Sequence, residues 1–176
     1  MLVFFSFIFT AALIAIDQLT KALVVLQVKP VKNIPVIEGW LYWTYRENTG
    51  AAFSMFSDNR AVFLISTTIL MGLCLYLMLF KYSKNVLLCF TFSLVLGGGF
   101  GNMIDRLAMG YVVDFIHVPF FPAIFNFADC CITVGGVLLF LLILYSMFKE
   151  ETDKKEKARK AENDAAESAK HDADAS

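Results

Sequence analysis

The sequence has little of what nucleophilic and metal-dependent enzymes commonly need. It contains two histidines and four cysteines among 176 residues. Cys74 and Cys89 stand alone in apolar runs, whereas Cys130 and Cys131 are adjacent, so a disulfide between them would be strained. The cysteines also lack the C-x-x-C spacing of zinc ligands. Neither G-x-S-x-G nor H-E-x-x-H occurs, and we interpret His117 as a packing or solvated residue. We therefore expect no disulfide framework, no metal, no cofactor, and no serine or cysteine nucleophile.

Charge is also scarce over most of the chain. The first 148 residues hold eight Lys or Arg and seven Asp or Glu, whereas residues 149–176 hold seven and nine. Apolar residues make up 58% of the chain and the mean hydropathy is +0.64, more than a soluble domain of this size needs. This asymmetry predicts a membrane body, residues 1–148, followed by a charged, solvated tail, 149–176, that is disordered or partly helical.

Four stretches with few or no charges are long enough to cross a bilayer as helices. The first has neither a basic leader nor a small-residue cleavage site, so we interpret it as a retained span rather than a signal peptide. The sequence thus predicts an all-α integral membrane protein with four transmembrane helices. These spans cover about residues 2–26, 61–80, 85–104 and 123–148.

The two loops on the outer side of this arrangement are residues 27–60 and 105–122. On the opposite side, the turn at 81–84 and the segment 149–160 carry a modest excess of Lys and Arg, which favours cytoplasmic termini. Within the first outer loop, the alternating aromatic run 36–45 predicts short strands near the membrane interface. We therefore expect a small β-containing element in that loop.

Four aspartates converge near the outer face. Helical rise of about 1.5 Å per residue places Asp17 roughly 22 Å into the first span. By the same counting, Asp105 ends the third span, Asp114 lies in the second outer loop, and Asp129 lies about two turns into the fourth span. Ionisable groups at membrane depth cost on the order of several kcal/mol unless paired or hydrated. This convergence indicates either a reactive site or a lattice of buried ion pairs.

Helical spacing indicates which polar side chains support one another. Asp17 and Lys21 are separated by four residues, a favourable pairing on one helix face. Asn102 precedes Asp105 by three residues and Arg106 by four, so these three side chains can project together. We interpret this group as ion pairs that offset one another's burial and hold the helices in register.

Asp114 and Asp129 are the strongest candidates for chemistry, because both have apolar neighbours and no adjacent cation. Two carboxylates close together in a low-dielectric site share a proton, so one can deprotonate water while the other donates to a carbonyl. Asn126, three residues before Asp129, can share its face. The alternative is a structural pairing of each aspartate with Lys21 or Arg106, and spacing alone leaves this alternative open.

Two other features surround these candidates. Gly97–Gly99 and Gly101 predict close helix approach or water access, and ordinary small-residue packing is favoured over a phosphate cradle. Asn48 precedes a turn at Thr49–Gly50 that could return the first loop to the membrane mouth. Its amide could bind a substrate backbone there, or it could be a plain loop residue.

Two functions other than catalysis fit a four-span chain with buried acids. A proton-coupled transporter would place its acid nearer the midplane, usually at broken helices, whereas the acids here gather toward one face. A membrane scaffold would not need two apolar-flanked aspartates in addition to balanced ion pairs. The pattern favours a water-using aspartyl site.

Four blocks of the sequence carry a resemblance to a known family. They are DQLTK, ENTGAAFS, GGGFGNMIDRLAMGYVVDFI and FNFAD, at residues 17–21, 47–54, 97–116 and 125–129. In this order they resemble the motif blocks of bacterial lipoprotein signal peptidase, signal peptidase II. The resemblance covers about residues 1–148, and the charged tail has no counterpart in it.

The resemblance implies a four-span aspartic endopeptidase of the bacterial inner membrane with a small β-containing periplasmic element. Such an enzyme removes signal peptides from diacylglyceryl-modified prolipoproteins by cleaving just before the lipidated cysteine. It implies Asp114 and Asp129 as the catalytic residues, without a metal. We expect a monomer in membrane lipid that binds no nucleic acid. The residues expected to bind substrate or support the site are Asp17, Lys21, Asn48, Gly50, Asn102, Asp105, Arg106, Asn126 and Ala128.

Overall fold

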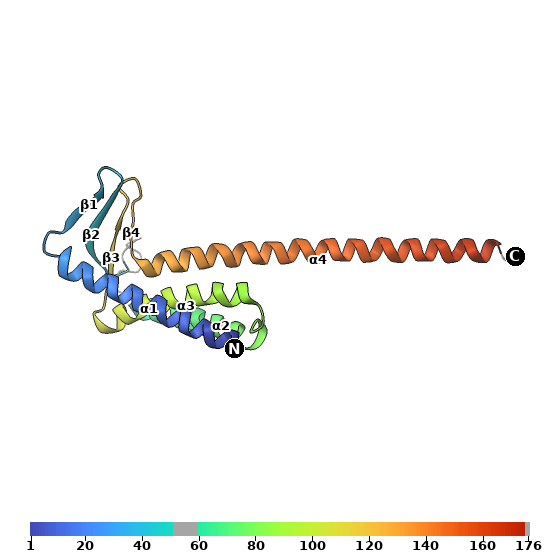
Figure 1. Ribbon diagram of the computed structural model, residues 1–176, viewed down its shortest axis with the longest axis horizontal. Coiled ribbons are helices and arrows are strands. Elements are labelled where there is room, and N and C mark those ends of the chain that lie inside the picture. Colours follow the sequence, from blue (N-terminus) through green and yellow to red (C-terminus); the bar gives the residue numbers. More distant parts are fainter. Residues whose placement is uncertain (51–59, 175–176) are drawn as a thin grey trace. The chain divides into compact units, whose positions relative to one another are not determined.

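The computed structural model describes residues 1–50 and 60–174 (Figure 1). The chain forms two compact units, Met1–Val137 and Leu138–Ser176. Every candidate site residue belongs to the first unit. Of the ENTGAAFS block, the last four residues, 51–54, lie outside the described residues.

Among the described residues, four helices are long and apolar enough to cross a membrane, as the sequence predicted. The second helix ends in a π-helical turn, η2 (Leu77–Lys81). The helices are α1 (Leu2–Gln27), α2 (Arg60–Tyr76), α3 (Val86–Ala108) and α4 (Phe127–Asp174).

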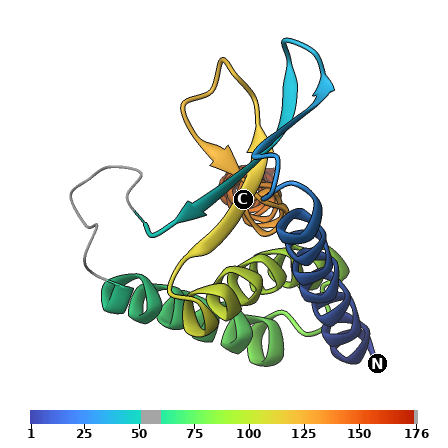
Figure 2. The same cartoon turned by 90° about the vertical axis from the view of Figure 1, so that its left-hand side faces the viewer.

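Helix α3 is the most buried of the four, and both α1 and α2 pack against it (Figure 2). Three consecutive glycines of α3 allow this packing. A Cβ at Gly97 would lie 2.8 Å from Leu13 Cβ of α1, and one at Gly99 would lie 2.9 Å from the sulfur of Met71 of α2. A Cβ at Gly98 would collide with the backbone carbonyl of Ala128 in α4. The predicted close approach of helices at these glycines is therefore observed.

A four-stranded antiparallel sheet lies beside the helices (Figure 2). Its order follows the chain: β1 (Asn33–Ile37), β2 (Leu41–Asn48), β3 (Val112–His117) and β4 (Ile124–Phe125). The sequence predicted strands only in the first outer loop, but β3 and β4 come from residues 105–126. That prediction was incomplete because the short apolar run of β3 has no clear polar alternation, and its pairing with β2 is non-local.

Two helix ends also differ from the prediction. Helix α3 continues to Ala108, so Asp105 and Arg106 lie within its last turn rather than beyond its end. Helix α4 begins at Phe127 instead of about Ala123, which places Asp129 in its first turn rather than two turns in. The reason is that β4 uses residues 124–125 in the sheet.

The tail, predicted to be disordered or partly helical, continues α4 as helix to Asp174. This segment is rich in Ala, Glu and Lys, which are strong helix formers. Two exposed pairs at i,i+4 spacing join Glu150 to Lys154 at 2.8 Å and Glu151 to Lys155 at 2.6 Å. Such exposed pairs contribute little to stability, because water and salt screen them.

A small apolar cluster anchors the sheet to the end of α1. Val24 of α1 and Val28, which directly follows that helix, pack with Val113 and Phe115 of β3, and all four are buried. Because side chains alternate along a strand, Asp114 between them is directed to the other face of β3. This packing sets the direction in which the Asp114 carboxylate points.

Candidate active site

Asp114 lies in the middle of β3 and is 1% exposed. Two asparagine amides hold its carboxylate, one from each side. Asn48, at the end of the neighbouring strand β2, donates from Nδ2 to Asp114 Oδ2 at 2.7 Å. Asn126 donates from Nδ2 to Asp114 Oδ1, also at 2.7 Å. Both carboxylate oxygens are therefore fixed by neutral donors.

Asp129 is held by the start of helix α4. Asn126 immediately precedes the helix, and its Oδ1 accepts the Asp129 backbone N–H at 2.9 Å, while Asp129 Oδ2 accepts the Asn126 N–H at 3.1 Å. This reciprocal pair is a capping box built from Asn and Asp. Asn102 of α3 donates from Nδ2 to the other oxygen, Asp129 Oδ1, at 2.8 Å. A helix N-terminus favours negative charge, so this position suits a carboxylate.

Asn126 therefore bridges the two aspartates. Since its Oδ1 accepts the Asp129 N–H, its amide nitrogen must face Asp114, and that nitrogen also donates to Asn102 Oδ1 at 3.1 Å. The structure brings together Asp114, Asp129, Asn102 and Asn126 in one hydrogen-bonded network, although they come from two helices, a strand and a helix cap.

Behind this network, Lys21 of α1 is buried among acceptors of α1 and α3. Its ammonium forms ion pairs with Asp17 at 2.8 Å and Asp105 at 3.0 Å, and it donates to Asn102 Oδ1 at 2.9 Å. An ammonium has three N–H donors, and these three partners match that number. The predicted pairing of Asp17 with Lys21 is confirmed. The ion pairs of Lys21 go to these two aspartates rather than to the candidate pair.

The two aspartates paired with Lys21 also connect other elements. Asp17 Oδ1 accepts the backbone N–H of Ala128 at 2.9 Å, which links α1 to the first turn of α4. Asp105 Oδ2 accepts the backbone N–H of Val113 at 3.1 Å, which links α3 to β3. Each contact fixes the backbone next to one candidate aspartate.

Gln18 is a contributor that sequence reasoning missed. Its amide nitrogen lies 3.0 Å from Asp105 Oδ1 and 3.2 Å from both Asp17 Oδ2 and the Gly101 carbonyl oxygen. The signal in the sequence was its place inside the DQLTK block, three residues before Lys21, a spacing that puts the two side chains on one helix face. Gly101 has no room for a side chain, because a Cβ there would lie 2.5 Å from Asp17 Oδ2.

The remaining predicted site residues lie around Asp114 and Asp129. Arg106 donates from Nη1 to the backbone oxygen of Asn102 at 3.4 Å, and its charge interacts with Asp114 and Asp129. The side-chain oxygen of Asn48 accepts the Gly50 N–H at 2.8 Å. The Asn48 amide is therefore directed at Asp114, whereas the sequence suggested a substrate backbone as its partner.

Burial raises the pKa of Asp114 to about 6. The hydrogen bonds from Asn48 and Asn126 lower it, whereas the nearby charge of Asp129 raises it further. A carboxyl group with a pKa in this range can both hold and release a proton near neutral pH, as an acid–base catalyst requires. The two carboxyl groups are close enough for the charge of one to affect the other.

A family model described as "Signal peptidase (SPase) II" matches residues 9–145. The chain belongs to the signal peptidase II family. The matched region contains all the residues of the network described above, and this finding confirms the resemblance of the motif blocks.

Curated relatives support the same assignment over most of the chain. A lipoprotein signal peptidase from Caldanaerobacter subterraneus is 41% identical over 140 residues, which is 80% of this chain and 96% of that protein. One from Streptococcus thermophilus is 42% identical over 141 residues, which is 80% of this chain and 90% of that protein.

Two solved structures, described as bacterial membrane enzymes, share the fold of this signal peptidase II family member. One is 31% identical with a TM-score of 0.74 and covers 81% of this chain and 88% of its own. The other is 32% identical with a TM-score of 0.73, and the match covers 79% of this chain and 92% of the chain in that structure. Family membership and four apolar helices make this protein a multi-pass membrane peptidase, which excludes the transporter and scaffold interpretations.

Proposed function

We propose that this protein is an aspartyl endopeptidase in which Asp114 and Asp129 together activate a water molecule. The observation that carries the proposal is the double role of Asn126. It donates to the Asp114 carboxylate through its side chain and exchanges two hydrogen bonds with Asp129. This arrangement links the buried carboxyl group of Asp114 to the half-buried carboxyl group of Asp129 through a neutral amide, which leaves their protons available for chemistry.

The proposed reaction divides the work between the two carboxyl groups. Asp129, at the helix N-terminus, takes a proton from water, and Asp114 gives its proton to the scissile carbonyl oxygen as the water oxygen attacks the carbon. The tetrahedral intermediate then collapses. Asp129 passes its proton to the leaving amine while Asp114 recovers one from the intermediate, so both groups return to their starting states.

The relatives are lipoprotein signal peptidases, which supports prolipoproteins as the substrate class. We propose that this enzyme cleaves diacylglyceryl-modified prolipoproteins just before the lipidated cysteine. A site where spanning helices meet a sheet suits a substrate whose lipid lies in the bilayer and whose scissile bond lies at its surface. We place the protein in the bacterial inner membrane, with cytoplasmic termini and the site near the periplasmic face.

The test is cleavage of a diacylglyceryl-modified prolipoprotein by the purified full chain in detergent. Asp114→Asn and Asp129→Asn are each expected to lower kcat by about a thousandfold or more, as loss of a group that acts in the transition state does. Asp153→Asn, an exposed aspartate of α4, is the matched control and should cleave at the wild-type rate. Duplicate reactions contain a chelator, and mass spectrometry identifies the new N-terminal cysteine.

Thermal denaturation of each variant separates lost chemistry from lost folding. Cleavage at the wild-type rate by folded Asp114→Asn or Asp129→Asn would refute the dyad. Loss of wild-type activity in chelator, restored by added metal, would refute the proposed metal-free mechanism while leaving the substrate assignment intact.

A further inference from the structure

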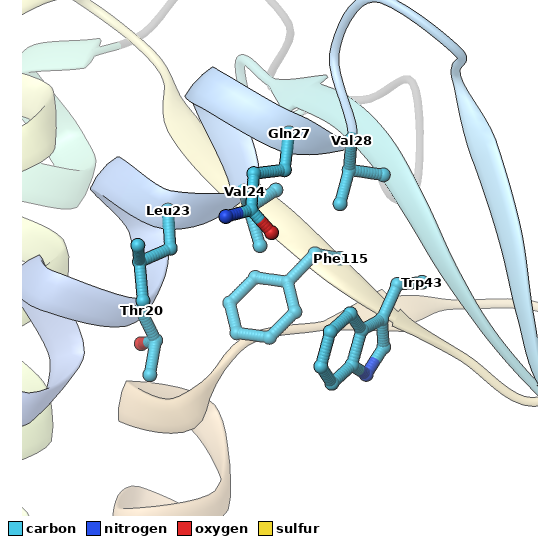
Figure 3. A pocket seen from close by; sticks show the side chains of 7 residues that line it. All are labelled: Thr20, Leu23, Val24, Gln27, Val28, Trp43 and Phe115. Carbon is cyan, nitrogen blue, oxygen red and sulfur yellow. The ribbon is translucent and has the colours of Figure 1, made fainter.

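An apolar recess lies between the end of α1 and the sheet (Figure 3). It has a volume of about 210 Å³, many times the roughly 10–15 Å³ that a cavity needs to hold one water molecule. Its walls are Leu23 and Val24 from α1, Val28 directly after that helix, and Trp43 and Phe115 from strands β2 and β3. A recess with walls of this kind is suited to a hydrocarbon group.

This recess is separate from the proposed catalytic pair. Phe115 contributes a wall and belongs to the apolar cluster with Val24 and Val28. Asp114 is its neighbour in β3, and its carboxylate points to the opposite face, toward Asn48 and Asn126. The strand therefore lies between the recess and the carboxylates, and a group in the recess does not occupy the site of peptide cleavage.

The recess opens onto the apolar surface of a spanning helix. Leu23 is 52% exposed and Trp43 is 44% exposed, although both line the recess. Leu19 and Leu26 of the same helix are exposed too, so leucines on both sides of Leu23 face outward. Because α1 is apolar and long enough to span a membrane, we expect this surface to face hydrocarbon.

The rim of the recess combines polar and apolar groups, as expected where an acyl chain joins its polar headgroup. Thr20 and Gln27 supply polar groups beside the apolar walls. In Figure 3 the indole ring of Trp43 lies beside the ring of Phe115. Tryptophan is enriched where hydrocarbon meets the polar headgroups, because its ring is apolar while its N–H needs a polar partner.

We propose that this recess binds one acyl chain of a bilayer phospholipid and holds it between α1 and strand β3. The bound chain supports the Phe115 face of the strand whose other face carries Asp114. The proposal rests on the membrane setting rather than on the proposed peptidase chemistry, so binding is expected to persist in the Asp129→Asn variant.

Intrinsic fluorescence can test the proposal, since the chain has two tryptophans. Trp40→Phe leaves Trp43 as the sole fluorophore, and Trp43→Phe leaves Trp40, which packs on Phe120 away from the recess. The full chain is placed in vesicles of phosphatidylcholine brominated in the acyl chain, with unbrominated vesicles as reference. We expect Trp43 to be quenched at least twofold more than Trp40.

Filling the recess supplies the decisive comparison. Leu23→Phe in the Trp40→Phe background is expected to reduce quenching of Trp43 by half or more. Leu19→Phe, one turn earlier on α1 at a position 63% exposed and outside the recess, is the matched control and should leave quenching unchanged. Thermal denaturation of both variants confirms that each is folded.

Two results would overturn the proposal. Equal quenching of Trp43 in the Leu23→Phe and Leu19→Phe variants would mean that Trp43 meets only the lipid that surrounds any spanning helix. Loss of quenching on adding an unbrominated diacylglyceryl-modified prolipoprotein to Asp129→Asn protein would assign the recess to the substrate's own acyl chain instead. Failure of cleavage, by contrast, would leave the quenching results unaffected.

Discussion

Three asparagine amides donate hydrogen bonds to the carboxylates of Asp114 and Asp129. An amide can donate and accept at once, so Asn48, Asn102 and Asn126 each satisfy a carboxylate and a second group. A neutral donor stabilises a carboxylate less than a full opposite charge does. Lys21, which could supply such a charge, is committed to two other aspartates.

The Asn48 contact gives a pH-dependence with a definite sign. Burial raises the pKa of Asp114 to about 6, so its protonated form is lost as the pH rises through that value, and kcat/KM should fall there. The Asn48 hydrogen bond lowers this pKa, because it favours the ionised carboxylate. Asn48→Ala should therefore raise the pKa and move the alkaline limb of the kcat/KM profile to higher pH.

The same substitution should also lower kcat/KM at its optimum by roughly tenfold or more, since a hydrogen bond to a charged group contributes about 1.5–3 kcal/mol. Thr49→Ala, at the next, exposed position, is the control for changes in the loop. The measurement is kcat/KM for prolipoprotein cleavage from pH 4 to about 9. An alkaline limb that stays fixed or moves to lower pH would contradict this role of Asn48.

Sequence spacing predicted some of these contacts and missed others for a physical reason. Asn126 and Asp129, three residues apart, do meet, and so do Asp17 and Lys21 at four. Contacts between side chains three or four residues apart on one helix can be predicted from sequence spacing. Gln18 could not be placed, because its partner Asp105 lies 87 residues away on another helix.

Helix α3 owes its central place to a run of glycines that face three different partners. Successive residues of a helix point about 100° apart, so Gly97, Gly98 and Gly99 face α1, α4 and α2 in turn. Of the three, Gly98 leaves least room for adjustment, since its neighbour is the backbone of Ala128 rather than a flexible side chain. The first turn of α4, with Asp129, is positioned by that contact.

Gly98→Ala is therefore expected to destabilise the protein by about 1–3 kcal/mol, the usual cost of overpacking, and to reduce cleavage severely. Gly72→Ala is the matched control on α2, where a Cβ would meet nothing within 4 Å. It should be neutral or stabilising by up to about 1 kcal/mol, because alanine is the better helix former. Thermal denaturation and cleavage assays measure both effects. Wild-type stability and activity in Gly98→Ala would contradict the close packing.

The four apolar helices could be predicted from the sequence because each is long and carries its signal locally. Strands β3 and β4 could not, since β3 is short and pairs with the distant strand β2, and β4 has only two residues. The beginning of α4 was misplaced for the same reason. Residues 124–125 are apolar enough to continue a helix, yet they pair with β3.

The proposed site and the family match both lie outside the C-terminal tail. Every residue of the proposed site lies in the unit Met1–Val137, and the family match ends at residue 145. Removal of residues 150–176 is therefore expected to change kcat/KM for prolipoprotein cleavage by less than about twofold. Circular dichroism should show the loss of helix that the truncation removes. A tenfold or larger loss of cleavage by the folded, truncated protein would assign the tail a part in catalysis.

The capping box at Asn126 and Asp129 has a consequence for the timing of biogenesis. The proposed base is the third residue of α4, and its carboxylate is oriented by the bonds that begin that helix. This helix is the last of the four to leave the ribosome. A nascent chain with three inserted spans therefore carries Asp114 without its counterpart. If Asp129 acts as proposed, the peptidase becomes competent only when its final span has inserted, so synthesis itself delays proteolysis until the enzyme is complete.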